Sequence, residues 1–105
     1  MRVFDHVGIP SAEQHPNERL VIATKTWVTD PHLHPFSVEW LRCEPDSTAP
    51  EILRTTPHVA YRVDDIAKES EGLEVILAPF HSVAGHVVGF YKTHDGAIVE
   101  LMMYK

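Results

Sequence analysis

Two short stretches of the sequence place a glutamate in the middle of an apolar run. Glu39 lies within "SVEWL" (residues 37–41), and Glu100 lies within "IVELM" (residues 98–102). Both runs have the composition of a β-strand, in which successive side chains point to opposite faces. A carboxylate that faces an apolar concavity is unfavourable unless it is paired, protonated or bound to a metal. The two glutamates are therefore the first candidates for chemistry.

Two histidines supply partners for these carboxylates. His6 lies in "DHVGI" and precedes Glu39, and His58 lies in "PHVAY" and precedes Glu100, with a longer interval in the second case. Two imidazoles and two carboxylates form a ligand set that suits a borderline divalent cation such as Zn, Ni, Fe, Mn or Co. Taken singly, each histidine is better explained as a hydrogen-bonded strand residue, and each glutamate as a solvated strand residue or half of a surface ion pair. The repeated pattern favours a shared metal site.

The elements that must position these residues repeat as well. Residues 58–63, 73–79, 86–92 and 97–104 read as strands, and Asp64-Asp65 can cap a helix over residues 66–71 that ends at Gly72. The second half is thus β-α-β-β-β. In the first half, residues 3–9, 24–29 and 36–43 read as strands and residues 11–19 as a loop. This half resembles the second except that its helix is shortened. The loss of one strand from the first half is also compatible with the pattern.

These patterns predict an α+β fold in one domain, residues 1–105. Two modules, about residues 1–48 and 57–105 and joined by a short helix at residues 50–55, would form a curved mixed sheet of eight strands or fewer around a cup. In the last strand, alternation places Ile98, Glu100 and Met102 on one face, opposite Leu101. Glu39 is likewise opposite Trp40. Both glutamates are therefore expected to point into one concavity.

The paired "HV…VE" halves, with "HVAYRVDDI" opening the second and "HDGAIVELMMY" closing it, resemble the vicinal oxygen chelate superfamily. This group contains glyoxalases, bleomycin-resistance proteins and extradiol dioxygenases. The resemblance covers most of residues 3–104, and it is strongest from His58 to Tyr104. It implies metal-ligand positions at His6, Glu39, His58 and Glu100, in a small single-domain member with a shortened first module.

The resemblance also implies a set of functions. The first is a divalent-metal-dependent isomerase or lyase, in which the metal chelates a small carbonyl substrate and Glu39 or Glu100 transfers a proton as general base. The second is a non-catalytic small-molecule-binding protein of the bleomycin-resistance type. The third, ranked lower, is a ring-cleaving dioxygenase with Fe(II) held by His6, His58 and Glu100.

Composition limits the classes of binding partner and the cellular location expected for the chain. The net charge of −6 disfavours binding to nucleic acid, and no apolar run approaches the ~20 residues that span a bilayer. The N-terminus does not read as a signal peptide, and Cys43 has no second cysteine to pair with, so a cytoplasmic protein is expected. Exposed strand edges in a shortened half favour a homodimer. The histidines of "HLH", His32 and His34, form a second candidate pair of metal ligands, although this segment lies in a predicted loop.

Overall fold

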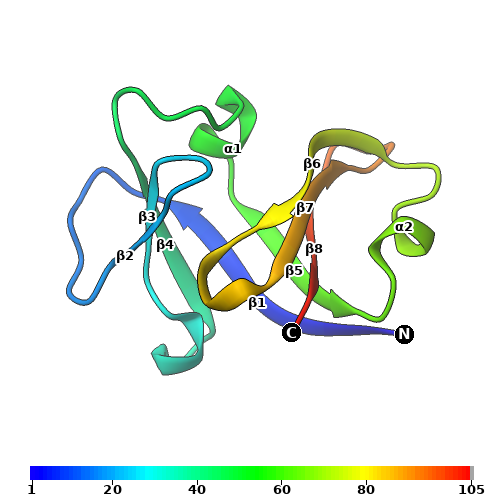
Figure 1. The fold of residues 1–105 in the computed structure, drawn as a ribbon, viewed down its shortest axis with the longest axis horizontal. Helices are drawn as coiled ribbons and strands as arrows, with labels where there is room; N and C mark the ends of the chain where they lie inside the picture. The colour runs from blue at the N-terminus through cyan, green and yellow to red at the C-terminus, as the bar shows by residue number, and fades with distance from the viewer. Residues whose placement is uncertain (105) are drawn as a thin grey trace.

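The structure is a computed structural model that describes residues 1–104, apart from the side chain of Ala84. All eight strands form one mixed sheet in the order β2-β3-β4-β1-β5-β8-β7-β6, which confirms the predicted α+β class and the curved sheet. Figure 1 shows the two halves side by side, with α2 on the outer side of the second. The elements are β1 Arg2–Pro10, β2 Arg19–Val21, β3 Thr26–Val28, η1 Pro31–Leu33, β4 Val38–Cys43, α1 Glu51–Thr55, β5 His58–Val63, α2 Ile66–Glu69, β6 Glu74–His81, η2 Val83–Gly85, β7 Val87–Lys92 and β8 Ile98–Met103.

Each half places its opening strand beside its closing strand. In the first half β1 pairs in parallel with β4, and in the second β5 pairs in parallel with β8. The two opening strands, β1 and β5, pair antiparallel and join the halves. The histidine-bearing and glutamate-bearing strands therefore occupy the four central positions of the sheet.

The first half departs from the sequence prediction in its strands. It contains four of them, so the anticipated loss of a strand is wrong: β2 pairs with β3 although it is only three residues long and follows a polar, proline-containing segment. The strand expected at residues 24–29 is shortened to β3, because a tight turn with Lys25 at φ 53° precedes it. Residues 11–18 form turns and bends, whereas α2 occupies the corresponding place in the second half.

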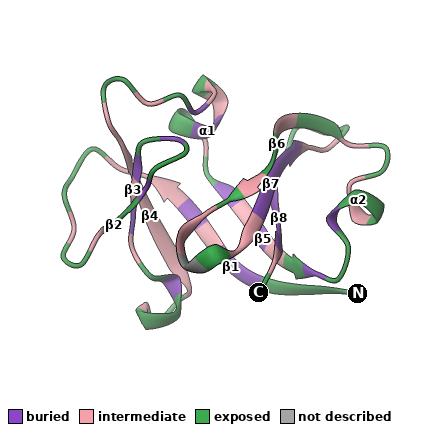
Figure 2. Cartoon of the chain, in the orientation of Figure 1, coloured by how far each residue is buried: buried purple, intermediate pink, exposed green. Residues whose placement is uncertain are grey.

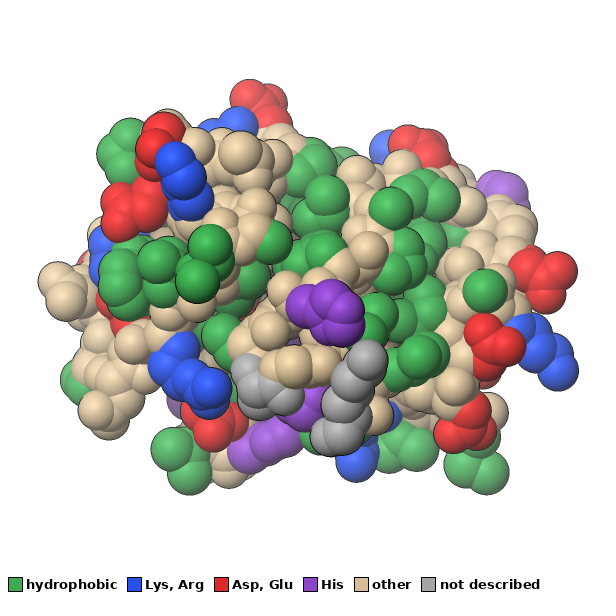
Figure 3. Space-filling view, viewed as in Figure 1, with side chains coloured by type: hydrophobic (Ala, Val, Ile, Leu, Met, Phe, Trp, Pro, Cys, Tyr) green, Lys and Arg blue, Asp and Glu red, His purple; other side chains and the backbone are tan. Residues whose placement is uncertain are grey.

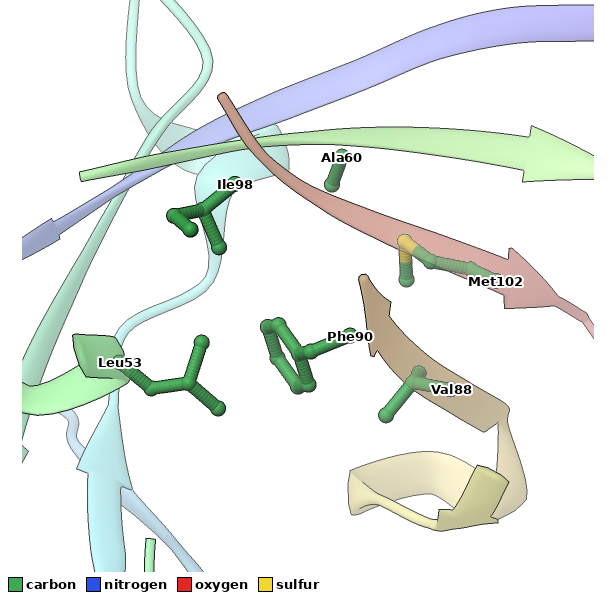
Figure 4. Close-up of a cluster of buried hydrophobic side chains, with 6 residues drawn as sticks. All are labelled: Leu53, Ala60, Val88, Phe90, Ile98 and Met102. Carbon is green, nitrogen blue, oxygen red and sulfur yellow. The ribbon is translucent and has the colours of Figure 1, made fainter. Parts of the chain in front are cut away.

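Apolar side chains pack on both faces of the second half. On the concave face a cluster joins α1 to β5, β7 and β8, and Figure 4 shows its members converging: Leu53, Ala60, Val88, Phe90, Ile98 and Met102. On the opposite face Ile66 of α2 packs with Tyr91 and Leu101. The side chain of Asp65 caps α2 by accepting a hydrogen bond from the Lys68 backbone N–H.

Burial differs between the halves. Most residues of β7 and β8 are buried, whereas every residue of β4 is of intermediate exposure (Figure 2). No helix within residues 1–104 has the length and hydropathy to cross a membrane.

Candidate metal centre

The four candidate ligands meet at the centre of the sheet. His6 comes from β1, Glu39 from β4, His58 from β5 and Glu100 from β8, and one ligand-capable atom of each lies within 4.8 Å of the others. The Oε1 atom of Glu100 is 3.0 Å from Nε2 of His58 and 3.3 Å from Nε2 of His6. The Oε1 atom of Glu39 is 3.5 Å from Nε2 of His6. The residues selected from the repeat thus form one cluster.

The register of the strands produces this cluster. Across the sheet, Gly8 stands between Glu39 and His58, and Ala60 stands between His6 and Glu100. The two small residues, each two positions after a histidine, leave space for the imidazoles beside them. At Gly8 the space is obligatory, because a Cβ atom there would lie 2.1 Å from Cε1 of His58.

The spacing of the four ligand-capable atoms is compatible with a cation, and Nε2 of His58 and Oε1 of Glu100 also lie within hydrogen-bonding distance, at 3.0 Å. The Nε2 atom of His6 is buried and has no hydrogen-bond partner among the described residues, although two carboxylates lie 3.3 and 3.5 Å away. Ligand atoms about 2.1 Å from one cation lie roughly 3.0 to 3.4 Å apart in octahedral or tetrahedral arrangements. The donor set therefore fits a divalent metal in both chemistry and spacing.

The charged residues of the cluster shift one another's pKa values. Burial, together with the nearby charge of Glu100, raises the pKa of Glu39. Burial acts in the same direction on Glu100, but the imidazoles of His58 and His6 lower its pKa to about 2. Burial would lower the pKa of His6, yet Asp5, Glu100 and Glu39 raise it to about 12. Three nearby carboxylates, those of Asp5, Glu100 and Glu39, thus hold a positive charge on His6.

A fifth residue, Asp5, was not identified from the sequence. A register shift between Phe4 and His6 marks a bulge in β1, and with it the Asp5 side chain lies on the His6 side of the strand. Regular alternation would have placed these neighbours on opposite faces, so only the adjacency "DH" could have hinted at the contact. Oδ2 of Asp5 is 2.7 Å from Nδ1 of His6.

The other carboxylate oxygen of Asp5, Oδ1, makes polar contacts with three further side chains. Oδ1 accepts a hydrogen bond from the Tyr104 hydroxyl at 2.6 Å, lies 3.1 Å from Nε2 of His32 and forms an ion pair with Nε of Arg62 at 3.4 Å. Burial would raise the pKa of Asp5, but the hydrogen bonds with His6, Tyr104 and His32 hold it well below its usual range. Asp5 is therefore a buried, ionised carboxylate.

The "HLH" motif does not act as a pair. His32 turns toward Asp5, whereas Nδ1 of His34 accepts a hydrogen bond from the Phe36 backbone N–H at 3.0 Å. The guanidinium of Arg62 lies at the same carboxylate of Asp5 as His32.

Two chambers flank the four ligands, and Glu39 and Glu100 line both of them. The smaller, of about 50 Å³, has an apolar wall that includes Leu53, Phe80 and Phe90. The larger, of about 170 Å³, has a polar lining that includes Arg19, Asp30, His32, His86 and Tyr104. Figure 3 shows histidine side chains gathered in the middle and lower part of one face, between the two halves.

Comparison with known proteins supports the fold. No family model and no curated protein matches the sequence. Among solved structures, a hypothetical protein from Bacillus halodurans C-125 superimposes with a TM-score of 0.72 at 16% identity, covering 99% of this chain and 95% of that chain. Methylmalonyl-CoA epimerase from Mycobacterium tuberculosis superimposes with a TM-score of 0.64 at 16% identity, covering 97% and 87%. The chain therefore shares its whole architecture with these two proteins.

Proposed function

We propose that this chain is a divalent-metal-dependent isomerase or lyase of the vicinal oxygen chelate superfamily, acting on a small oxygen-chelating carbonyl substrate. The observation that carries the proposal is the meeting of His6, Glu39, His58 and Glu100 within 4.8 Å. The architecture shared with methylmalonyl-CoA epimerase gives independent support, since that protein's name denotes an isomerase.

His6, His58, Glu39 and Glu100 would hold a cation such as Zn, Ni, Fe, Mn or Co. When bound, the cation would supply Lewis acidity at the substrate carbonyl and so favour loss of a proton from the neighbouring carbon. The polar chamber gives oxygen atoms of the substrate access to the ligands, and the apolar chamber accepts a short hydrocarbon group.

Glu39 is the better placed of the two carboxylates to move a proton. Its side chain is 14% exposed, against 7% for Glu100, and it makes the longest of the contacts within the cluster. In the proposed step a C–H bond next to the carbonyl breaks, the proton passes to a carboxylate oxygen of Glu39, and the electron pair delocalises into the carbonyl. Return of the proton from Glu39 to the adjacent carbon of the enediolate, with the hydroxyl proton passing between the two oxygens, completes an isomerisation. Inversion at the original carbon needs a proton delivered from the opposite face, a role for which Glu100 is the second carboxylate.

Solvent deuterium exchange tests this proposal. The metal-loaded protein, purified without a His-tag, is incubated with candidate α-hydroxycarbonyl compounds in deuterated water, and NMR measures the deuterium that each compound takes up. Replacing Glu39 with Gln should lower the exchange rate by about 100-fold or more, because the general base is lost. Glu13→Gln, a change at an exposed position of the first half, serves as the matched control. An exchange rate that survives Glu39→Gln contradicts the assignment of the base.

The same experiment separates the alternatives. Tight binding of a chelating compound without deuterium exchange would favour a binding protein of the bleomycin-resistance type, which the apolar chamber could also serve. The Fe(II) dioxygenase needs Glu39 to stand apart from a triad of His6, His58 and Glu100. The 3.5 Å contact between Glu39 and His6 favours the four-ligand set instead.

A further inference from the structure

We propose that Asp5 is the positioning residue of the metal centre: it fixes the ring orientation and the proton-bearing nitrogen of His6, and Tyr104, His32 and Arg62 fix Asp5 in turn. The inference rests on the proposed metal site, and it adds a specific carboxylate outside the ligand set. Nothing in the repeat that identified the ligands points to Asp5.

Asp5 meets the geometric requirement for this role. Its Oδ2 atom lies 2.7 Å from Nδ1 of His6, while Nε2 of the same ring faces Glu39 and Glu100. A proton on Nδ1 that is donated to Asp5 leaves the Nε2 lone pair for a cation. A carboxylate in this position orients the ring and raises the basicity of the ligating nitrogen.

Asp5 is itself held from several parts of the chain. The Tyr104 hydroxyl comes from the residue after β8, His32 from η1 and Arg62 from β5, and all three converge on Oδ1. The ring of Tyr104 stacks on His86, with ring centroids 4.1 Å apart. Because Asp5 is 6% exposed and both of its carboxylate oxygens have polar partners, the carboxylate has little freedom to turn away from His6.

The second half has no counterpart of this carboxylate. The residue before His58 is Pro57, which carries no polar side chain, and Nδ1 of His58 is buried without a hydrogen-bond partner among the described residues. The Nε2 atom of His58 hydrogen-bonds with Oε1 of Glu100 at 3.0 Å, and packing holds the rest of the ring: Gly8 leaves room on one side, and Phe90 makes an edge contact on another, with centroids 5.1 Å apart. The role assigned to Asp5 is therefore specific to His6.

Metal affinity of the full chain, measured with Zn(II) against a competing chelator, tests the inference. Asp5→Ala should weaken binding by about 10- to 100-fold, the usual effect of losing such a partner. Tyr104→Phe, which removes one of the hydrogen bonds that hold Asp5, should weaken it less. Asp46→Asn is the matched control, because Asp46 pairs only with Lys25 at an exposed position.

Two spectroscopic measurements distinguish positioning from a general loss of structure. The absorption spectrum of the Co(II)-loaded protein should change in Asp5→Asn, because the negative charge beside Nδ1 of His6 is lost, and remain unchanged in Asp46→Asn. NMR should show a proton on Nδ1 of His6 whose resonance shifts in Asp5→Asn. If Asp5→Ala does not fold, Asp5→Asn and Tyr104→Phe carry the same test.

The outcomes are separable. A wild-type protein that binds none of Zn(II), Mn(II), Ni(II) and Fe(II) overturns the metal centre, and the role of Asp5 with it. A wild-type protein that binds Zn(II), with Asp5→Ala or Asp5→Asn within twofold of its affinity and with an unchanged Co(II) spectrum, overturns only the role of Asp5.

Discussion

The two central histidines occupy equivalent places in the two halves but are held by different forces. The Nδ1 atom of His6 faces the carboxylate of Asp5, whereas His58 is enclosed by Gly8 and Phe90, and its Nδ1 atom has no hydrogen-bond partner among the described residues. A repeated strand pairing can therefore place equivalent ligands while the local neighbours differ completely. The repeat determines where a ligand lies, and its neighbours determine how firmly it is oriented.

The outer faces of the two halves also differ: the second half is covered by apolar packing and the first by a polar segment. In the second half α2 covers an apolar cluster that includes Leu101. In the first half the polar segment 11–18 lies there: the ring of His15 stacks on Trp40 at 5.0 Å, and Glu18 forms two hydrogen bonds with Arg42. Glu39 belongs to this less buried half and is the most exposed of the four ligands.

Removing one of the four proposed ligands is expected to have the largest effect on metal affinity, and it compares the contributions of the two halves. His58→Ala and Glu100→Ala should each weaken metal binding by more than about 100-fold, beyond the effect of losing an outer partner. Glu39→Ala should weaken it less, since Glu39 is the more exposed carboxylate. Chelator competition measures all three, with the exposed His94→Ala as control. Near-normal affinity in both His58→Ala and Glu100→Ala would exclude the site.

Gly8→Ala tests whether packing positions His58. The added Cβ would lie 2.1 Å from Cε1 of the ring, so the ring must move, and such overpacking costs about 1–3 kcal/mol of stability. Denaturant unfolding should show this loss, and metal affinity should fall with it. In a His58→Ala background the loss of stability should largely vanish, because the colliding ring is gone. An equal loss in both backgrounds would mean that the ring is not the cause.

The pH dependence of metal binding tests the charge on His6. Asp5, Glu100 and Glu39 raise its pKa to about 12 against the effect of burial, so below that pH the imidazole carries a proton that a cation must displace. Affinity should consequently rise with pH, by about tenfold for each unit between pH 6 and 8. Calorimetry in buffers of different ionisation enthalpy should detect the released proton. Binding that is independent of pH and buffer would contradict this electrostatic description.

The smallest effect is expected in the outer polar contacts of the first half. Glu18→Gln weakens the paired hydrogen bonds to Arg42 and should lower stability by about 1 kcal/mol or less. Metal affinity should change by less than about twofold, because this ion pair lies apart from the ligands. Denaturant unfolding and chelator competition provide the two values. A larger fall in affinity would show that this contact also positions Glu39.

The sequence predicted the cluster of four residues because two regular properties coincided. Strand alternation chose the face of each glutamate, and the repeat paired Glu39 with Glu100 and His6 with His58; the structure brings all four together. The fold class and the opening and closing strands followed from the same patterns.

The features that the sequence did not predict depend on irregular geometry. Asp5 was missed because a bulge, which has no distinct composition, turns it toward His6. β2 was missed because pairing with β3, rather than the propensity of three residues, makes it a strand. His32 was assigned to a loop, and only tertiary packing brings it to Asp5.

The metal content of the full chain, purified without a His-tag and loaded with excess Zn(II), Mn(II), Ni(II) or Fe(II) before desalting, tests the central claim most directly. The wild type should bind one equivalent per chain of at least one of these metals, and Glu100→Ala should lose that equivalent. Less than about a tenth of an equivalent of every metal would contradict the claim.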